Sequence, residues 1–330
     1  MNILFATGHA YLPQTHGGLQ NSTHELCQQL IRKGHNVAVL ASLRRNGWIG
    51  WNARIRGRLH AMASGISLAR DVWPGYPVWR SWKPWNALPE VVERQKTDAI
   101  VVLSVQAAPM AAAAEKTGLP FLMQLLDVEF DELGGDFSTF HARPCIANSR
   151  FTAATYREAF GVEPTVIYPL IDPDSYRTRC MGDKVVFINP AKKKGVDIAI
   201  AVARLLPSIE FLFVETWPLL PQTRARLLEA LSGLPNVTLC GPFRDMRPIY
   251  SQARVLLVPS TWNEAYGRVA MEAQINGIPV VASDRGGLPE AVGPGGLVIA
   301  SDAPAETWAG AVRDLHSDPD MHRQYCHESA

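Results

Sequence analysis

The chain has 330 residues, of which 47% are hydrophobic and 19% charged, and its mean hydropathy is −0.03. This length allows two domains with a sizeable core each, and the composition is that of a soluble globular protein. The formal net charge of +1 gives no reason to expect a nucleic acid as a partner, and none is predicted. No uninterrupted apolar segment reaches the roughly 20 residues that a membrane span needs.

The cysteine pattern indicates a reducing compartment. The five cysteines are scattered, odd in number and form no C-x-x-C pair, so we expect a cytoplasmic protein without a disulfide or zinc framework. The amino-terminal residues 1–13 have no basic segment, and their apolar run is too short for a signal peptide. They predict a first β-strand instead.

Apolar runs of strand length alternate with helical patterns along most of the chain. In the first half, strands are predicted at residues 2–7, 36–42, 99–104, 120–127, 145–148 and 165–169. Helical segments separate several of them. The clearest helix covers residues 21–34, where apolar positions recur every three to four residues and Gly34 ends the helix.

The second half repeats this scheme. Strands are predicted at residues 184–189, 209–215, 237–241, 255–260, 279–283 and 296–300, with helices at 196–206, 222–232, 246–253, 267–276 and 305–316. Near-continuous apolar strands joined by crossover helices are typical of parallel sheets covered on both faces.

Two such sets in tandem predict an α/β chain with two doubly wound, Rossmann-like domains. We place the first domain at residues 1–168, a linker rich in Pro and Asp at 169–183, and the second domain at 184–330. Ligands of such folds bind outside the carboxyl ends of the strands. We therefore expect the two sets of strand ends to face each other across a cleft.

Residues 44–85 do not fit the alternation. They hold six of the nine Trp, and eight Lys or Arg against a single acid, Asp71. A basic, Trp-rich segment is typical of contact with an anionic membrane surface or with an acceptor molecule. The alternative is a helix and an irregular loop packed on the first domain. We assign the segment to the variable, acceptor side of the molecule.

The stretch NEAYGRVAMEAQINGIPVVASDRGGLPEAV, which begins at Asn263, places two carboxylates around a glycine. Gly267 stands at a predicted helix start, where unpaired N–H groups and a partial positive charge favour a phosphate, and Arg268 adds a full charge. Glu272 lies one helical turn after Arg268 and suits a ribose diol. Glu264 still lies in the loop before the helix, and its side chain is expected to reach the group that is attached to the phosphate. This arrangement suits a nucleotide-sugar.

Other glycine-rich turns follow strand ends. Gly286 and Gly287 precede another helix and are expected to bring more backbone N–H groups to the same site. In the first domain, Gly17 and Gly18 open a helix after the first strand. Lys192 to Lys194 lie next to Gly195 at a further helix start. A lysine run is either a solvated surface or, at the carboxyl end of a strand, a phosphate site.

Taken in order, the first-loop GG, IANS, the KG turn, PS…NEAYG…E and GGLPE resemble the retaining glycosyltransferases of family 4, which have the GT-B fold. The resemblance covers nearly the whole chain outside residues 44–85. It implies transfer of a sugar from a nucleotide-diphosphate donor, a UDP- or GDP-sugar, to an acceptor hydroxyl with retained configuration. It also implies that no metal and no cofactor is needed, and that the acceptor is a glycan, a lipid-linked compound or a small molecule.

The resemblance also assigns roles by position. Glu264 would hold hydroxyls of the donor sugar, Glu272 the ribose and Lys194 the phosphates. Gly18, beside Gly17, would hold the diphosphate from the first domain. The diphosphate would also be held by the backbone amides of Ala265, Tyr266, Gly267 and Arg268.

The chain departs from the family pattern at two positions. Leu126 stands where the family commonly has a His beside the reacting sugar, which leaves Asp127 as the candidate near the reacting carbon. Asn189 stands at the position of a phosphate-binding Arg, and Lys192 or Lys193 is expected to supply the missing charge. In the front-face route proposed for this class, the departing phosphate takes the acceptor's proton, so no protein base is required.

Two other functional classes stay open on the sequence. A non-catalytic nucleotide-sugar binder, or a partner subunit of an active glycosyltransferase, is favoured by Leu126 and Asn189. A nucleotide-sugar epimerase or hydrolase on the same fold is the other alternative. The D-x-D at residues 172–174 lies in the linker and is not taken as a metal site. A peripheral position at the inner face of the membrane, through residues 44–85, is the alternative to a purely cytoplasmic protein.

Overall fold

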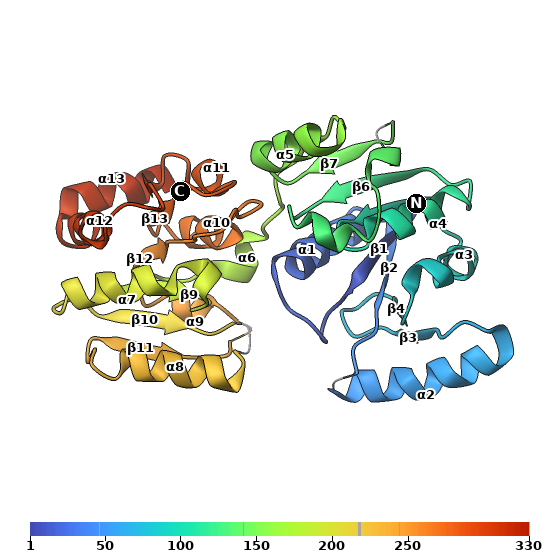
Figure 1. The fold of residues 1–330 in the computed structure, drawn as a ribbon, viewed down its shortest axis with the longest axis horizontal. Helices are drawn as coiled ribbons and strands as arrows, with labels where there is room; N and C mark the ends of the chain where they lie inside the picture. The colour runs from blue at the N-terminus through green and yellow to red at the C-terminus, as the bar shows by residue number, and fades with distance from the viewer. Residues whose placement is uncertain (46, 141, 217–218, 244, 330) are drawn as a thin grey trace. The chain divides into compact units, whose positions relative to one another are not determined.

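The computed structural model describes residues 1–45, 47–140, 142–216, 219–243 and 245–329. The chain divides into two compact units, Met1–Leu170 and Ile171–Ala330, each built on its own sheet (Figure 1). The predicted fold class, two α/β units with parallel sheets, is therefore confirmed. Among the described residues, no helix combines the length and the apolar composition that crossing a bilayer requires.

The first unit has eight strands in the order β3-β4-β2-β1-β5-β6-β7-β8, all parallel except β3 against β4. The strands are β1 Asn2–Ala10, β2 Asn36–Ser42, β3 Ala69–Asp71, β4 Val78–Ser81, β5 Ala99–Leu103, β6 Phe121–Leu125, β7 Cys145–Ala147 and β8 Thr165–Val166. The helices are α1 Gly18–Arg32, α2 Gly47–Ser64, α3 Pro84–Gln95, α4 Ala107–Glu115 and α5 Arg150–Phe160, with short 3₁₀ turns η1 Phe130–Leu133 and η2 Ser138–Phe140. All six strands predicted for this half are present.

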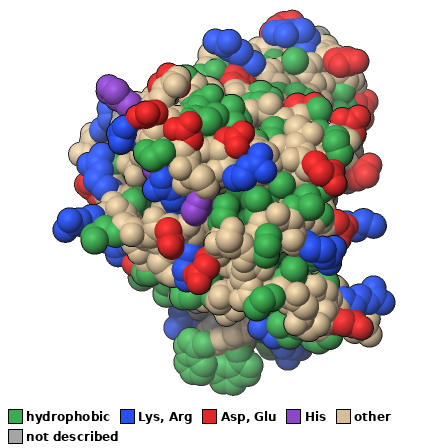
Figure 2. Space-filling view, turned by 90° about the vertical axis from the view of Figure 1, so that its left-hand side faces the viewer, with side chains coloured by type: hydrophobic (Ala, Val, Ile, Leu, Met, Phe, Trp, Pro, Cys, Tyr) green, Lys and Arg blue, Asp and Glu red, His purple; other side chains and the backbone are tan. Residues whose placement is uncertain are grey.

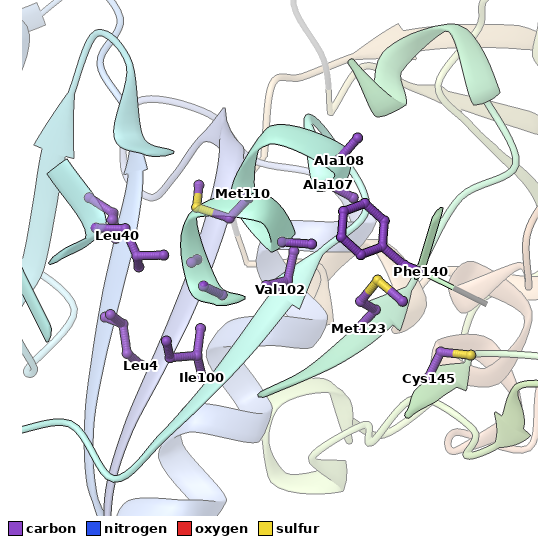
Figure 3. Packing of buried hydrophobic residues seen from close by; sticks show 14 of the residues in the cluster. Leu4, Leu40, Ile100, Val102, Ala107, Ala108, Met110, Met123, Phe140 and Cys145 are labelled. Carbon is purple, nitrogen blue, oxygen red and sulfur yellow. The ribbon is translucent and has the colours of Figure 1, made fainter. Parts of the chain in front are cut away.

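The core of the first unit lies on both faces of this sheet because successive strand residues point to opposite sides. On β1, Leu4 packs into the cluster beneath α3, α4 and α5, whereas Phe5 packs into the cluster with α1. Figure 3 shows the first cluster from close by, with Leu4, Leu40 and Ile100 beside Met110 of α4. Burying each such side chain contributes about 1.5–3 kcal/mol.

Residues 44–85 carry more regular structure than the irregular loop that the alternative interpretation expected. After α2, the strands β3 and β4 extend the sheet beyond β2. Arg80 on β4 is 1% exposed: its Nε donates to Asp71 Oδ2 at 2.6 Å and Nη2 to the Leu12 carbonyl at 2.6 Å. The single acid of the segment thus pairs with a buried arginine, which also holds the loop after β1.

We expect Arg80→Met to lower the free energy of unfolding by about 2–3 kcal/mol, because the buried carbonyls and Asp71 lose their donor. The loss stays below that of a fully buried ion pair because the Asp71 side chain is 25% exposed and can be rehydrated. Denaturant unfolding measures this loss of stability, and Arg56→Met, at an exposed position on α2, is the control. Equal unfolding of the two variants would contradict the structural role of Arg80.

The second unit has six parallel strands in the order β11-β10-β9-β12-β13-β14. They are β9 Lys184–Ile188, β10 Phe211–Val214, β11 Val237–Cys240, β12 Ala253–Val258, β13 Val280–Ser283 and β14 Gly296–Ile299. The helices are α6 Pro173–Tyr176, α7 Val196–Leu205, α8 Pro221–Leu231, α9 Arg247–Tyr250, α10 Arg268–Gln274, α11 Leu288–Val292, α12 Ala305–Ser317 and α13 Pro319–Ser329, with a 3₁₀ turn η3 Lys192–Lys194.

Both faces of this second sheet are covered. Side chains of α7, α8 and α12 pack on one face, and those of α9, α10 and α11 pack on the other. All six predicted strands are present, but the predicted helix 246–253 is shorter because Ala253 already belongs to β12. Helix α13 was not predicted.

The surface in Figure 2 shows acidic and basic side chains interspersed, without a large area of one sign. Charge alone therefore marks no ligand site on this face, and a candidate site has to be sought at the ends of the strands.

Candidate functional site

The winding of the second sheet reverses between β9 and β12. β9 is the first strand of the unit, and the chain runs outward from it through β10 and β11 before it returns to β12 on the other side. Ligands of doubly wound sheets bind at such a reversal, outside the carboxyl ends of the strands. A small pocket of about 30 Å³ lies there, lined by Asn189 and Lys194 after β9 and by Ser260 and Glu264 after β12.

Glu264 and Lys194 meet in this pocket although 70 positions separate them. Glu264 Oε1 accepts from Lys194 Nζ at 2.5 Å and from Ser260 Oγ at 2.7 Å. The side chains of Lys194 and Glu264 are only 16% and 12% exposed. A carboxylate held by two donors is fixed in direction, so it can present its remaining acceptor sites to a ligand.

A glycine turn supports the loop that carries Glu264. Gly286 has φ +62°, and a Cβ on it would lie 2.1 Å from the Glu264 carbonyl oxygen. The Gly287 N–H donates to the same carbonyl at 2.7 Å. The expectation that Gly287 offers its N–H to a ligand is therefore wrong, because the loop uses that donor. The Gly286–Gly287 turn thus packs against the backbone of the loop that carries Glu264 and supports it.

The lysine turn after β9 is fitted to the β12 loop in a similar way. Gly195 has φ +80°, and a Cβ on it would lie 1.8 Å from the Pro259 carbonyl oxygen. The Thr261 N–H donates to the Lys193 carbonyl at 3.1 Å, and Lys193 Nζ lies 3.8 Å from the centre of the Trp262 ring. Lys193 is thus stacked on an aromatic ring at the rim of the site, a cation–π contact.

The other two charged residues of the motif lie deeper. Arg268 and Glu272 are 9% and 6% exposed. Arg268 Nε donates to Glu272 Oε1 at 3.3 Å and Nη2 to Tyr176 Oη at 3.0 Å, while Tyr250 Oη donates to Glu272 Oε2 at 2.8 Å. The guanidinium of Arg268 therefore contacts Glu272 and Tyr176, whereas the sequence predicted it at a phosphate site.

The remaining predicted donor residues surround these contacts. Gly267 immediately precedes α10, Ala265 is half-buried, and the Tyr266 side chain is buried in the core beneath α10 and α11. Asn189 is buried, and its Oδ1 accepts from the Thr216 N–H at 3.0 Å and from Thr216 Oγ1 at 2.5 Å. Asn189 thus fixes the loop after β10.

Three contact residues were missed by sequence reasoning. Ser260 was quoted only as part of the PS motif, and Tyr176 and Tyr250 come from the short helices α6 and α9. No spacing rule links Tyr250 to Glu272 or Tyr176 to Arg268, because these contacts depend on tertiary packing.

In the first unit, the structure places Gly17 at the amino end of α1, which begins at Gly18. Asp127 follows β6. Burial, with the nearby charges of Glu129 and Glu132, raises the pKa of Asp127 to about 7. Among the described residues, Asp127 Oδ1 has no hydrogen-bond partner. Leu126 packs against the apolar cluster under α1.

In the described part of the chain, no three His, Cys, Asp or Glu side chains are grouped to hold a metal ion. Asp172 of the D-x-D accepts from the Asp174 N–H at 3.3 Å and so caps α6. This contact is the ordinary function of an Asp before a helix.

Two doubly wound α/β units of this topology are the architecture of GT-B glycosyltransferases, and solved structures of that class resemble the chain. A glycosyltransferase from Rickettsia africae aligns over 99% of this chain and 92% of its own, with a TM-score of 0.73 and 16% identity. Anabaena HepE, solved with UDP-glucose, aligns over 100% and 93%, with a TM-score of 0.75 and 18% identity. These identities support the fold alone.

The sequence comparisons define the family. Residues 16–175 match the model of Glycosyltransferase Family 4, and residues 182–318 match that of Glycosyl transferases group 1. Together the two models cover most of the chain, which therefore carries the family 4 and group 1 glycosyltransferase domains, and the resemblance predicted from the motifs is confirmed.

Curated relatives match shorter segments. A D-inositol 3-phosphate glycosyltransferase of Corynebacterium aurimucosum is 47% identical over 79 residues, 23% of this chain and 18% of the relative. An alpha-maltose-1-phosphate synthase of Mycolicibacterium smegmatis is 33% identical over 187 residues, 50% of this chain and 48% of the relative. The matched segments thus span less than half of these relatives' own length.

Proposed function

We propose that the chain is a retaining glycosyltransferase that moves a sugar from a UDP- or GDP-sugar to an acceptor hydroxyl without a metal ion. The observation that carries the proposal is the Lys194–Glu264–Ser260 cluster at the point where the winding of the second sheet reverses. HepE binds UDP and UDP-glucose, and the curated relatives are named as sugar-transferring enzymes, which supports the donor class.

In this mechanism, cleavage of the sugar–phosphate bond builds negative charge on the diphosphate. Lys194, together with the backbone amides of residues 265–268, stabilises that charge more in the transition state than in the ground state. Glu264 holds donor-sugar hydroxyls and thereby orients the anomeric carbon. The departing phosphate takes the acceptor's proton, so the front-face route needs no protein base.

Glu272 is proposed to hold the ribose beside its contacts with Arg268 and Tyr250, since each carboxylate oxygen can accept more than one hydrogen bond. The side chain of Arg268 then positions Glu272, while its backbone amide stays among the donors proposed for the diphosphate. Lys193 supplies positive charge near the phosphates from its place over Trp262.

The acceptor side is proposed for the first unit, with Asp127 near the reacting carbon and Gly17 and Gly18 toward the diphosphate. The acceptor is a glycan, a lipid-linked compound or a small molecule. We propose a cytoplasmic protein with peripheral membrane contact through residues 44–85.

A non-catalytic nucleotide-sugar binder is the second candidate. It is favoured by Asn189, because that amide is committed to Thr216 and brings no charge to the phosphates. Incubation of donor with a panel of acceptors separates the two. A glycosylated product supports the transferase, slow release of free sugar indicates a hydrolase, and binding without turnover indicates the binder.

Calorimetry with nucleoside diphosphates and with the corresponding sugar nucleotides tests the donor site. We expect Glu264→Ala to leave nucleoside-diphosphate affinity nearly unchanged and to weaken the complete donor about 10- to 100-fold, as the loss of one hydrogen bond to a charged group would. Glu272→Ala is expected to weaken both ligands alike.

The exposed Glu306→Ala on α12 is the matched control for loss of a carboxylate. Glu264→Gln keeps the shape of the side chain and separates the charge from the contact with Lys194. Equal donor affinity for the wild type, Glu264→Ala and Glu272→Ala would overturn the assignment of both residues.

A further inference from the structure

Helix α2 presents a stripe of large apolar side chains to solvent. The stripe consists of Trp48, Trp51, Ile55, Leu59 and Met62, which are 72%, 53%, 44%, 64% and 85% exposed. On a helix of 3.6 residues per turn, they fall within an arc of roughly 80°. The two Trp rings stack with their centres 5.4 Å apart. A lone exposed apolar residue is ordinary, but a contiguous stripe of this size marks an interaction surface.

The opposite face of α2 is made of small residues and packs on the first unit. Ala53 is 5% exposed, and a Cβ on Gly57 would lie 2.5 Å from Ser67 Oγ. His60 Nε2 lies 2.8 Å from Glu90 Oε1 on α3. This is the reverse of an ordinary surface helix, whose large apolar side chains face the core. The packing fixes the apolar stripe in its outward direction.

Basic residues flank the stripe, and α2 carries no acid. Arg54 and Arg56 lie roughly 100° to either side of the centre of the stripe on a helix of 3.6 residues per turn, and Arg58 lies nearer to it. None of the three makes a salt bridge with an acid in the described ranges. Their aliphatic stems can lie along apolar surface while the guanidinium groups reach phosphate oxygens.

We propose that α2 docks on an anionic lipid bilayer, lying in the plane of the surface with the stripe in the headgroup–acyl boundary. Trp on the apolar side and Arg on both flanks match that boundary, which is amphipathic and negatively charged. Stripe-to-stripe contact with a second copy would bring the Arg residues of two helices together, which is unfavourable. The proposal centres the predicted contact of residues 44–85 on one face of α2. Outside this helix, Trp79 and Arg80 are buried in the first unit, whereas Trp73 and Trp82 are 51% and 42% exposed.

Vesicle flotation of the full chain tests the proposal without donor or acceptor, so its outcome is independent of the proposed function. We expect the wild type to float with vesicles of equal parts phosphatidylcholine and phosphatidylglycerol, but not with phosphatidylcholine alone. Leu59→Glu combined with Met62→Glu is expected to reduce the bound fraction at least about tenfold. Arg56→Glu combined with Arg58→Glu is expected to reduce it as well, and raised salt to weaken wild-type binding.

Met181→Glu combined with Leu220→Glu is the matched control, because these side chains are 75% and 74% exposed elsewhere in the chain. This control is expected to float like the wild type, and circular dichroism verifies that every variant is folded. Failure of the wild type to float, or equal flotation of the α2 and control variants, would overturn the proposal. So would a wild-type dimer that ignores vesicles and is dissociated by the α2 substitutions, since the stripe would then be a self-interface.

Discussion

Gly286→Ala is expected to lower the free energy of unfolding of the second unit by about 2–5 kcal/mol. A φ of +62° costs a non-glycine residue about 1–2 kcal/mol. In addition, the new Cβ would lie 2.1 Å from the Glu264 carbonyl oxygen and 2.6 Å from its nitrogen. Backbone atoms cannot turn aside as a side chain can, and such overpacking costs about 1–3 kcal/mol more.

The same substitution is expected to weaken donor binding, because the Glu264 backbone has to move. Its carboxylate would then lose its alignment with Lys194 and Ser260. Denaturant unfolding measures the stability, and hydrogen exchange of peptides from residues 255–300 locates the loss in the second unit. Calorimetry on the folded variant measures the donor affinity.

Two matched glycines separate backbone strain from overlap. Gly277 has φ +64° but its nearest atom to an added Cβ is 3.7 Å away, so Gly277→Ala is expected to cost only the strain, about 1–2 kcal/mol. Gly233 has no neighbour within 4 Å of an added Cβ, and Gly233→Ala is expected to stay within about 0.5 kcal/mol of the wild type. If Gly286→Ala unfolded no more readily than Gly277→Ala, the turn would not support Glu264.

The fold was predictable from the periodicity of apolar residues along the sequence. Apolar runs of strand length alternate with helical patterns, and each predicted run contains a strand. Inner strands such as β9 and β12 are buried along most of their length, whereas the edge strands β8, β11 and β14 are partly exposed. The structure of residues 44–85 was harder to predict, because composition does not distinguish a buried, paired arginine from an exposed one. Arg80 is buried against Asp71, whereas Arg56 is exposed, and nothing local in the sequence distinguishes them.

The candidate site was predictable to a similar extent. Lys194 and Glu264 follow strands that turned out to be neighbours, so their contact could be expected from topology. The direction of Arg268 could not be, because a side chain in the first turn of a helix can point toward a ligand or back to its own unit. In the structure, the Arg268 side chain donates to Tyr176, which lies 92 positions away in the sequence.

Asp127→Asn is expected to stabilise the chain at pH 8 by about 2–4 kcal/mol and to change little at pH 4. Burial and two neighbouring carboxylates raise the pKa of Asp127 from 3.8 to about 7. Between these values the folded chain holds a proton that the unfolded chain has released, so wild-type stability falls as the pH rises from 4 to 7. Each pKa unit corresponds to about 1.4 kcal/mol. The isosteric amide carries no charge and removes this dependence.

Denaturant unfolding of the wild type and Asp127→Asn at pH 4, 6 and 8 measures how the free energy of unfolding depends on pH. Glu129→Gln is the control: it removes one of the charges that raise the pKa of Asp127, so it should flatten the pH dependence only in part. If Asp127 also lies near the reacting carbon, the stabilised variant should lose turnover. A carboxylate that destabilises the fold and yet serves the reaction is an example of the trade-off between stability and activity. A variant that is destabilised equally at all three pH values would show that the carboxylate serves only the fold.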